Sequence, residues 1–229
     1  DPAALPALIP PGLPDKPLFH HAIRETYRLN QVDDATLRKV RATYYGQVSY
    51  ADWLLGELMD AIDRTGHADD TALIASSDHG DYAGDYGLIE KWPSGLEDCL
   101  THVPLIIRAP KIIKKPGRTS DALAETLDIY PTLLELCRPS FTKTQHPLGG
   151  VSLVPVLTGA KKSVRDTAVS YWGNATTVRT STHRFICKTV KEKKKDFALY
   201  DMRSEPDPVE NLAKKKPELV QELLKKLPR

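Results

Sequence analysis

The sequence predicts an α/β protein that carries a smaller antiparallel sheet and a helix at its C-terminal end. Three observations predict this fold class. A long stretch with one apolar face precedes the apolar run Thr71–Ser77, and a helix that covers a strand is the unit of a doubly wound sheet. A second apolar run, Val103–Arg108, ends at Ala109-Pro110. Beyond Val151 the sequence consists of short runs rich in strand-forming residues, separated by turn residues or charged residues.

Residues 1–32 are predicted to form an extended connector. Six of the first 17 residues are proline, which interrupts both regular helices and central strands. A long helix is expected from Asp34, because apolar residues then recur every three or four positions. They are Leu37, Val40, Tyr44, Val48, Ala51, Leu55, Leu58 and Ile62. Asp33 or Asp34 can cap the start of this helix, and Gly66 its end.

Residues 33–150 are expected to form the α/β core portion. The runs Thr71–Ser77 and Val103–Arg108 are predicted to be buried strands. Residues 80–98 contain four glycines and no regular period, which indicates a long functional loop. Leu123–Leu127 is ambiguous, and a helix is expected to follow it, capped by Asp128.

Residues 151–229 are predicted to form the small antiparallel sheet and a terminal helix. The expected strands are Ala168–Trp172, Thr176–Thr180, Arg184–Val190 and Phe197–Tyr200. The expected helix, Pro217–Leu227, has apolar residues at Leu219, Leu223, Leu224 and Leu227.

Composition limits the class of protein. With 229 residues, of which 41% are hydrophobic and 27% charged, the chain can bury a sizeable core. No apolar run approaches the roughly 20 residues of a membrane span. Residues 180–229 hold 13 Lys and Arg against 8 Asp and Glu, but no aromatic interleaving accompanies this charge, so no nucleic-acid partner is expected. The three cysteines fit neither a dense disulfide framework nor a zinc-binding spacing.

The junction Asp78-His79-Gly80-Asp81 indicates a metal site. It follows the first predicted strand directly, and ligands bind at the carboxyl ends of strands in open α/β sheets. Asp offers an anionic oxygen and His a nitrogen, so this pair suits Ca²⁺, Mg²⁺, Mn²⁺ or Zn²⁺ without choosing among them. The alternative is a strand-end cap with a hydrogen-bonded histidine.

The same block resembles the sulfatase family of the alkaline-phosphatase superfamily. That family carries a strand, Asp-(His or Asn)-Gly, a glycine-punctuated loop, a lysine, an acidic residue and a second strand ending in Ala-Pro. Here these features are Asp78-His79-Gly80, Lys91, Glu97 and Ala109-Pro110, in that order. Further similarity lies at Tyr45–Asp52, Asp128–Leu136 and Leu199–Leu212. The resemblance covers roughly residues 33–212 and implies the C-terminal portion of an alkaline-phosphatase-like α/β/α sandwich.

The resemblance implies roles for individual residues. Asp78 and His79 would bind a divalent metal, which in this family is most often Ca²⁺, and Lys91 would contact the sulfate as a catalytic and substrate-binding residue. The alternative for Lys91 is an ordinary surface lysine. The nucleophile of these enzymes, a formylglycine made from Cys in a Cys-x-Pro-Ser-Arg segment, lies far upstream of the metal strand, and no such segment precedes Asp78 here.

Other residues near this block have two interpretations each. Trp92 can stack on a substrate ring or pack in the core, and His102, just before the second strand, can bind substrate or be a polar surface residue. Asp81 and Asp85 can orient His79 or cap turns. Cys137-Arg138-Pro139-Ser140-Phe141 imitates the nucleophile segment, but Phe141 replaces the required Arg. We therefore expect Cys137 to be a small buried residue at a helix end.

The expected function is hydrolysis of sulfate esters, with this chain as the C-terminal part of the enzyme and inactive alone. Its expected partners are a sulfated small molecule or glycan, and an N-terminal sulfatase segment or partner chain that supplies the formylglycine. Two alternatives stay open: a non-catalytic remnant or subunit that binds anionic glycans, and a phosphonate or phosphodiester hydrolase on the same scaffold. If an export signal lies upstream, a secreted, periplasmic or lysosomal location follows.

Overall fold

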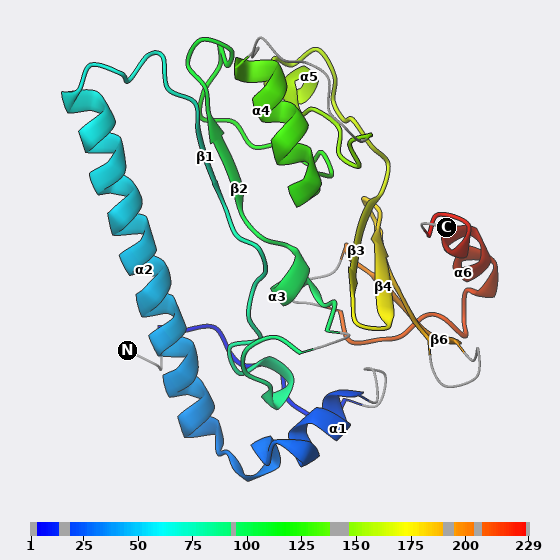
Figure 1. The fold of residues 1–229 in the computed structure, drawn as a ribbon. Coiled ribbons are helices and arrows are strands. Elements are labelled where there is room, and N and C mark those ends of the chain that lie inside the picture. Colours follow the sequence, from blue (N-terminus) through cyan, green and yellow to red (C-terminus); the bar gives the residue numbers. More distant parts are fainter. Residues whose placement is uncertain are drawn as a thin grey trace.

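The computed structural model describes residues 4–13, 19–92, 95–137, 147–189, 195–203 and 208–227. Figure 1 shows a long helix along one side, a narrow two-stranded ribbon beside it, and a four-stranded sheet with its own helix on the other side. The helices, with short 3₁₀ turns marked η, are α1 (Phe19–Thr26), η2 (Leu29–Gln31), α2 (Asp34–Arg64), η3 (Asp85–Gly87), α3 (Asp98–Thr101), η4 (Thr126–Asp128), α4 (Ile129–Cys137), α5 (Val154–Leu157) and α6 (Pro217–Leu224). The strands are β1 (Leu73–Ser76), β2 (Leu105–Arg108), β3 (Ala168–Trp172), β4 (Ala175–Arg179), β5 (His183–Thr189) and β6 (Lys195–Asp201).

The long helix α2 begins and ends where the sequence predicts. The Asp33 carboxylate accepts a hydrogen bond from the Thr36 amide (2.8 Å), and Gly66 follows the helix with a φ of +77°. Only its first two turns are buried, at Leu37 and Arg41. The predicted apolar face is therefore only partly buried within the described part of the chain, and Val48, for example, is 52% exposed.

The two strands of the central ribbon are antiparallel and only partly buried. Leu73 pairs with Arg108 and Ser76 with Leu105, so the parallel pairing of a doubly wound sheet does not occur between β1 and β2. The prediction of two buried strands is also wrong for this chain, because Ile106 is 61% exposed. The physical reason is that a two-stranded ribbon has two faces and two edges, and the described elements cover only part of them.

The C-terminal sheet confirms the predicted strands and helix. Its order is β3-β4-β5-β6, all antiparallel. Alternation gives the sheet two apolar faces. Val178, Phe185 and Leu199 face α6, where Val220 and Leu223 complete the cluster. The opposite face packs against Leu96, near the end of the long loop. The residues of this second cluster that come from the sheet are Ala175, Ile186, Ala198 and Tyr200, with Trp172 and Met202 packed beside them.

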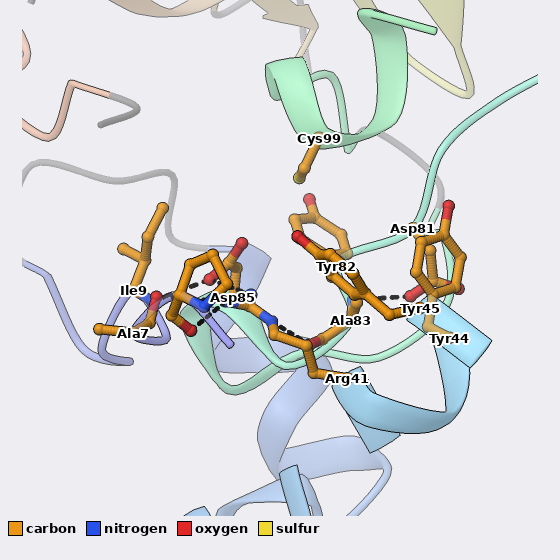
Figure 2. Close-up of a pocket in the computed structure, with 11 residues that line it drawn as sticks. Ala7, Ile9, Arg41, Tyr44, Tyr45, Asp81, Tyr82, Ala83, Asp85 and Cys99 are labelled. Carbon is orange, nitrogen blue, oxygen red and sulfur yellow. Dashed lines mark hydrogen bonds and ion pairs between the residues drawn. The ribbon is translucent and has the colours of Figure 1, made fainter. Parts of the chain in front are cut away.

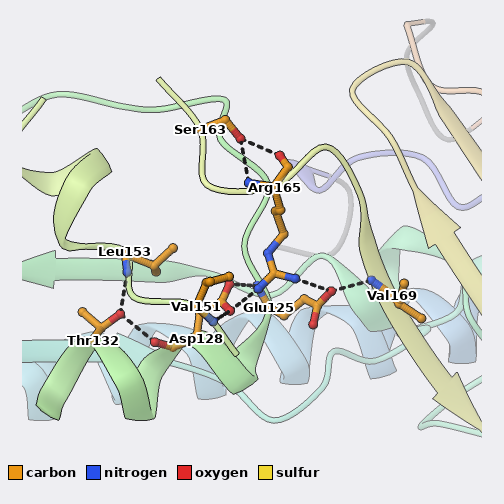
Figure 3. A network of polar contacts seen from close by, with 8 residues as sticks. All are labelled: Glu125, Asp128, Thr132, Val151, Leu153, Ser163, Arg165 and Val169. Carbon is orange, nitrogen blue, oxygen red and sulfur yellow. Dashed lines mark hydrogen bonds and ion pairs between the residues drawn. The ribbon is translucent and has the colours of Figure 1, made fainter. Parts of the chain in front are cut away.

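Two buried ionic contacts fasten this sheet to the rest of the chain. Figure 3 shows Arg165 between two carboxylates at the start of α4. Its guanidinium lies 2.7 Å from Glu125 Oε1 and contacts the fully buried Asp128, while Glu125 also accepts from the amide of Val169 in β3 (2.9 Å). The helix start differs from the expectation: Glu125 is the N-cap, and Asp128 completes a capping box with it.

The second contact joins β5 to α3. Arg184, 1% exposed, donates to Asp98 Oδ1 at 3.0 Å and lies over the Tyr200 ring at 4.9 Å.

None of the helices in the described ranges combines the length and the apolar character of a bilayer-crossing helix.

Candidate functional site

The turn after β1, which carries Asp78 and His79, approaches α3 through Gly80. Gly80 makes this approach possible, because a Cβ at this position would lie 1.9 Å from the Cys99 carbonyl oxygen. The Gly80 amide donates to the Leu100 carbonyl (2.9 Å), which secures the contact. Glycine in the Asp-His-Gly block is therefore required by a close backbone approach.

The imidazole of His79 has a defined tautomer. Its Nδ1 lies 2.7 Å from the Gly80 carbonyl oxygen. A carbonyl can only accept, so Nδ1 carries the proton and Nε2 presents a lone pair. Lys91 Nζ contacts that Nε2 atom, although the lysine lies 12 residues along the loop.

The Asp78 carboxylate completes a group of three converging side chains. Asp78 Oδ2 lies 3.6 Å from His79 Nε2, and its side chain is 85% exposed. The backbone amide of His79, which donates to Asp78 Oδ1 (3.0 Å), lowers the pKa of Asp78. An ionised oxygen, a nitrogen lone pair and an ammonium group therefore meet at one exposed point.

The donor geometry fits part of a metal shell. Two ligands that each lie roughly 2.0–2.4 Å from one cation stand roughly 3–4 Å apart, which matches the separation of Asp78 Oδ2 and His79 Nε2. Within the described ranges, no cluster of three or more His, Cys, Asp or Glu side chains with metal-binding geometry is found. Asp78 and His79 can thus supply two ligands of a cation and need further donors to complete the shell.

Asp81 and Asp85 hold the loop instead of orienting His79. Asp81 Oδ1 accepts from the amides of Ala83 (2.7 Å) and Glu90 (3.0 Å), and this closes the glycine-rich turn. Asp85 accepts from the Ile9 amide (2.8 Å) and pairs with Arg41 at 2.5 Å. The turn-capping interpretation describes Asp81, whereas Asp85 joins the loop to the N-terminal segment and to α2; the Nδ1 proton of His79 goes to the Gly80 carbonyl.

The Pro-rich segment packs against this loop. Arg41 donates to the carbonyls of Pro6 (3.2 Å), Ala7 (3.1 Å) and Ala83 (3.1 Å), as Figure 2 shows, so one buried guanidinium joins α2, the N-terminal segment and the loop. A hollow of about 310 Å³ lies beside it, and none of Asp78, His79 and Lys91 lines it. The pocket and the candidate site are therefore separate features.

Two further candidates lie outside the converging group. Trp92 packs in the core: its ring lies 4.2 Å from that of Tyr27, and its Nε1 donates to the Ile89 carbonyl (2.8 Å). His102 is exposed at the end of α3, and its amide donates to the Asp98 carbonyl (2.8 Å). Cys137, expected to be buried, is an exposed free thiol, and residues 138–141 of the imitated segment lie outside the described residues.

Trp172 belongs to this site as well, although the sequence did not predict it. It ends β3, and Lys91 Nζ lies 5.5 Å from its ring centroid. The rings of His79 and Trp172 are 6.5 Å apart. No local pattern indicates this contact, because 81 residues separate Lys91 from Trp172; only the predicted end of the strand could have drawn attention to it.

The buried carboxylate of Glu97 stabilises the loop through its contacts with Tyr82 and His20. Glu97 is 1% exposed; it accepts from the Tyr82 hydroxyl (2.6 Å) and lies 2.7 Å from His20 Nε2. Burial alone would raise the pKa of Glu97. The hydrogen bond and charge of His20, the charge of Arg184 and the Tyr82 hydroxyl outweigh burial and lower that pKa to about 2.

The fold is that of the alkaline-phosphatase superfamily of hydrolases. More narrowly, the chain belongs to the sulfatase family. The family profile described as Sulfatase matches residues 16–138, and a second profile, described as N-sulphoglucosamine sulphohydrolase, C-terminal, matches residues 84–229.

Individual relatives agree with this assignment. The chain is 30% identical to arylsulfatase K of Xenopus laevis over 83% of its own length and 37% of that protein. It is 30% identical to choline-sulfatase of Rhizobium meliloti over 82% of its length and 36% of the relative. The structure resembles a phosphonate monoester hydrolase from Silicibacter pomeroyi with a TM-score of 0.81 and 25% identity, covering 99% of this chain and 50% of the other. The chain thus spans a little over a third of these curated relatives.

Proposed function

We propose that the protein hydrolyses sulfuric esters and that this chain supplies the part of the active site that binds a divalent cation, Ca²⁺ by preference, and the sulfate group. Membership of the sulfatase family supports the reaction class. The observation that carries the residue assignment is the convergence of Asp78, His79 and Lys91 beside β1.

Each residue of the group has a chemical role in this proposal. Asp78 and His79 would bind the cation through Oδ2 and Nε2, with the Gly80 carbonyl keeping Nδ1 protonated. When bound, the cation supplies positive charge against the non-bridging oxygens of the sulfate. The lone pair of Nε2 can bind either the cation or the Lys91 ammonium. When it binds the cation, the ammonium would donate to a sulfate oxygen instead.

The overall reaction breaks the bond between sulfur and the ester oxygen. In the net balance one water is consumed: its oxygen ends on sulfur, one of its protons goes to the leaving alcohol, and the other is released to solvent with the sulfate. The nucleophile in this proposal is a formylglycine outside this chain, in an upstream segment or a partner chain. The chain spans only part of its relatives, so an additional segment of this kind is consistent with the matches.

A second candidate function is hydrolysis of phosphonate or phosphodiester substrates. The structural likeness to a phosphonate monoester hydrolase favours it. A sulfate monoester and a phosphonate monoester each present a tetrahedral anion to a cation and an ammonium group, so the described residues suit both. Substrate comparison separates the two: the sulfatase proposal expects the larger kcat/KM for an aryl sulfate, and the alternative for an aryl phosphonate.

Replacement of Asp78 tests the metal assignment. In the native protein that contains this chain, Asp78→Ala should greatly reduce retained divalent metal and lower turnover by orders of magnitude, since a direct anionic ligand is removed. Elemental analysis after gel filtration measures the metal, and the exposed Asp60→Ala in α2 is a matched control. Metal content equal to wild type would contradict the assignment.

Replacement of Lys91 tests the sulfate contact. A charge placed where negative charge develops contributes roughly 10²- to 10³-fold in rate, so Lys91→Ala should lower kcat/KM for an aryl sulfate by about that factor with metal content unchanged. Lys91→Arg should restore little, because a planar fork replaces a compact charge. The exposed Lys111→Ala should behave like wild type. Unimpaired turnover by Lys91→Ala would show that the lysine is a surface residue.

If the protein is instead a non-catalytic module that binds anionic glycans, the native protein will turn over neither class of ester. Mass spectrometry of the native protein for a formylglycine peptide distinguishes this outcome from a poor choice of substrate.

A further inference from the structure

Trp172 brings the C-terminal sheet to the candidate site. Its indole lies 5.5 Å from Lys91 Nζ and its ring centroid 6.5 Å from that of His79. These contacts connect β3 with the loop after β1, two segments that are far apart in the chain. Besides the Asp78 carboxylate, the ammonium of Lys91 therefore has the His79 nitrogen and the indole face beside it.

The indole is held by a rigid element. Trp172 is paired with Ala175 across the β3–β4 hairpin and packs beside the buried cluster that contains Leu96 and Tyr200. The other end of β3 is fastened through the Val169 amide to Glu125, which Arg165 clamps. Trp172 is thus held by strand pairing and by packing against this cluster, whichever partner the Lys91 side chain contacts.

Lys91, in contrast to Trp172, has a flexible side chain. Its side chain has a flexible four-carbon stem and rises from a glycine-rich loop, so an ammonium without neighbours would sample many positions. An aromatic face attracts a cation that lies within about 6 Å of the ring centroid, and Trp is the strongest ring for this purpose. When a cation takes the His79 lone pair, the indole is the neighbour that the ammonium keeps.

We propose that Trp172 is a positioning residue that holds the Lys91 ammonium at the anion site. This inference rests on the proposed function, because it assigns the held ammonium to a sulfate group. The inference also means that sulfate binding depends on the C-terminal sheet, which contributes an aromatic ring, as well as on the loop that carries Lys91. The geometry needs an aromatic face at this position and no hydrogen bond from the indole nitrogen.

Binding of inorganic sulfate to the native protein tests the proposal. Calorimetric titration should give a Kd that is roughly 3- to 30-fold weaker for Trp172→Ala, the range expected for loss of a cation–π contact. Trp172→Phe keeps a ring and should recover at least half of this loss on a logarithmic scale. Tyr171→Ala is the matched control, because Tyr171 is the preceding residue of the strand, lies on its other face and is 74% exposed. It should bind sulfate like wild type.

A double-variant cycle separates positioning from general structural damage. If Trp172 acts through Lys91, the variant with both Lys91→Ala and Trp172→Ala should bind sulfate no more weakly than Lys91→Ala alone. Thermal unfolding confirms that each variant is folded. If Trp172→Ala does not fold, Trp172→Leu, which removes the ring and keeps a large apolar side chain, replaces it and should show the same loss of sulfate binding.

The outcomes are distinguishable. If Lys91→Ala leaves the Kd for sulfate unchanged, the proposed sulfate contact of Lys91 fails and this inference fails with it. If Lys91→Ala weakens binding and neither Trp172 variant does, only the inference is overturned. If the two losses add fully in the double variant, Trp172 acts independently of the ammonium, and the positioning role is likewise overturned.

Discussion

The replacement Glu97→Gln measures how strongly the fold depends on one buried charge. Glu97 is buried beneath the loop that carries Lys91, between the Tyr82 hydroxyl and the imidazole of His20, and it lies within the electrostatic influence of Arg184. Glutamine keeps the shape of the side chain and removes its charge. The variant therefore leaves the packing intact and tests the electrostatic contribution.

The size of the effect follows from the pKa. The pKa of Glu97 is about 2 in the folded protein against 4.5 as the ordinary value. A depressed folded-state pKa stabilises the protein above the unfolded pKa, and that stabilisation is lost as the pH falls from about 4.5 toward 2. At about 1.4 kcal/mol per unit, the charged form contributes about 3 kcal/mol near neutral pH.

Urea unfolding of wild type and variant at several pH values provides the assay. At pH 7, Glu97→Gln should lower the free energy of unfolding by about 3 kcal/mol. By pH 3 the difference should shrink to about 1 kcal/mol, because the carboxyl group of the unfolded wild-type chain is then protonated and most of the stabilisation by the charged form is lost. Glu57→Gln, on the exposed side of α2, should change stability by less than about 0.5 kcal/mol. Equal stabilities at pH 7, or a difference that does not vary between pH 7 and pH 3, would refute this reasoning.

Two other predictions concern the backbone approach and the exposed thiol. Gly80→Ala should destabilise the protein by at least about 1–3 kcal/mol, since its Cβ would overlap a backbone carbonyl of α3. Gly46→Ala, in the interior of α2 with nothing within 4 Å, should stabilise it by about 0.5–1 kcal/mol; thermal unfolding of both variants checks the pair, and equal melting temperatures would contradict the predicted overlap. Cys137 should react with maleimide in the folded protein and appear in peptide mass spectra as a thiol. A mass corresponding to formylglycine at Cys137 would mean that the chain carries its own nucleophile.

Local patterns predicted the longest helix and the C-terminal sheet well, but the extended connector predicted for residues 1–32 is wrong over Phe19–Thr26, which forms α1, because the prolines that break helices stop at Pro17. The caps at Asp33 and Gly66 delimit α2, and the strand runs after residue 168 match the four strands of the C-terminal sheet. These features depend on residues close together in sequence, where periodicity and backbone preference act directly. The order of Asp78, His79, Gly80 and Lys91 likewise indicates the sulfatase family, because a motif of this kind is read along the chain.

The surroundings of the candidate site could not be predicted in the same way. Trp92 and Trp172 are both tryptophans beside a turn or strand end, and the local sequence favours Trp92, which directly follows Lys91. The structure packs Trp92 against Tyr27 and brings Trp172 to Lys91. The choice between them depends on how the C-terminal sheet docks, and that docking rests on long-range ion pairs such as Arg184 with Asp98.

The sequence by itself indicated the family, predicted the long helix α2, the six strands and the helices α4 and α6, and singled out Asp78, His79 and Lys91 as one group. Only the tertiary structure decided that Asp81 and Asp85 hold the loop, that β1 and β2 run antiparallel, and that Trp172 borders the site. The physical reason is the range of the interactions. Helix caps and strand alternation are encoded within a few residues, whereas a carboxylate or an indole acquires its role from partners tens of residues away, and such partners leave no periodic trace in the chain.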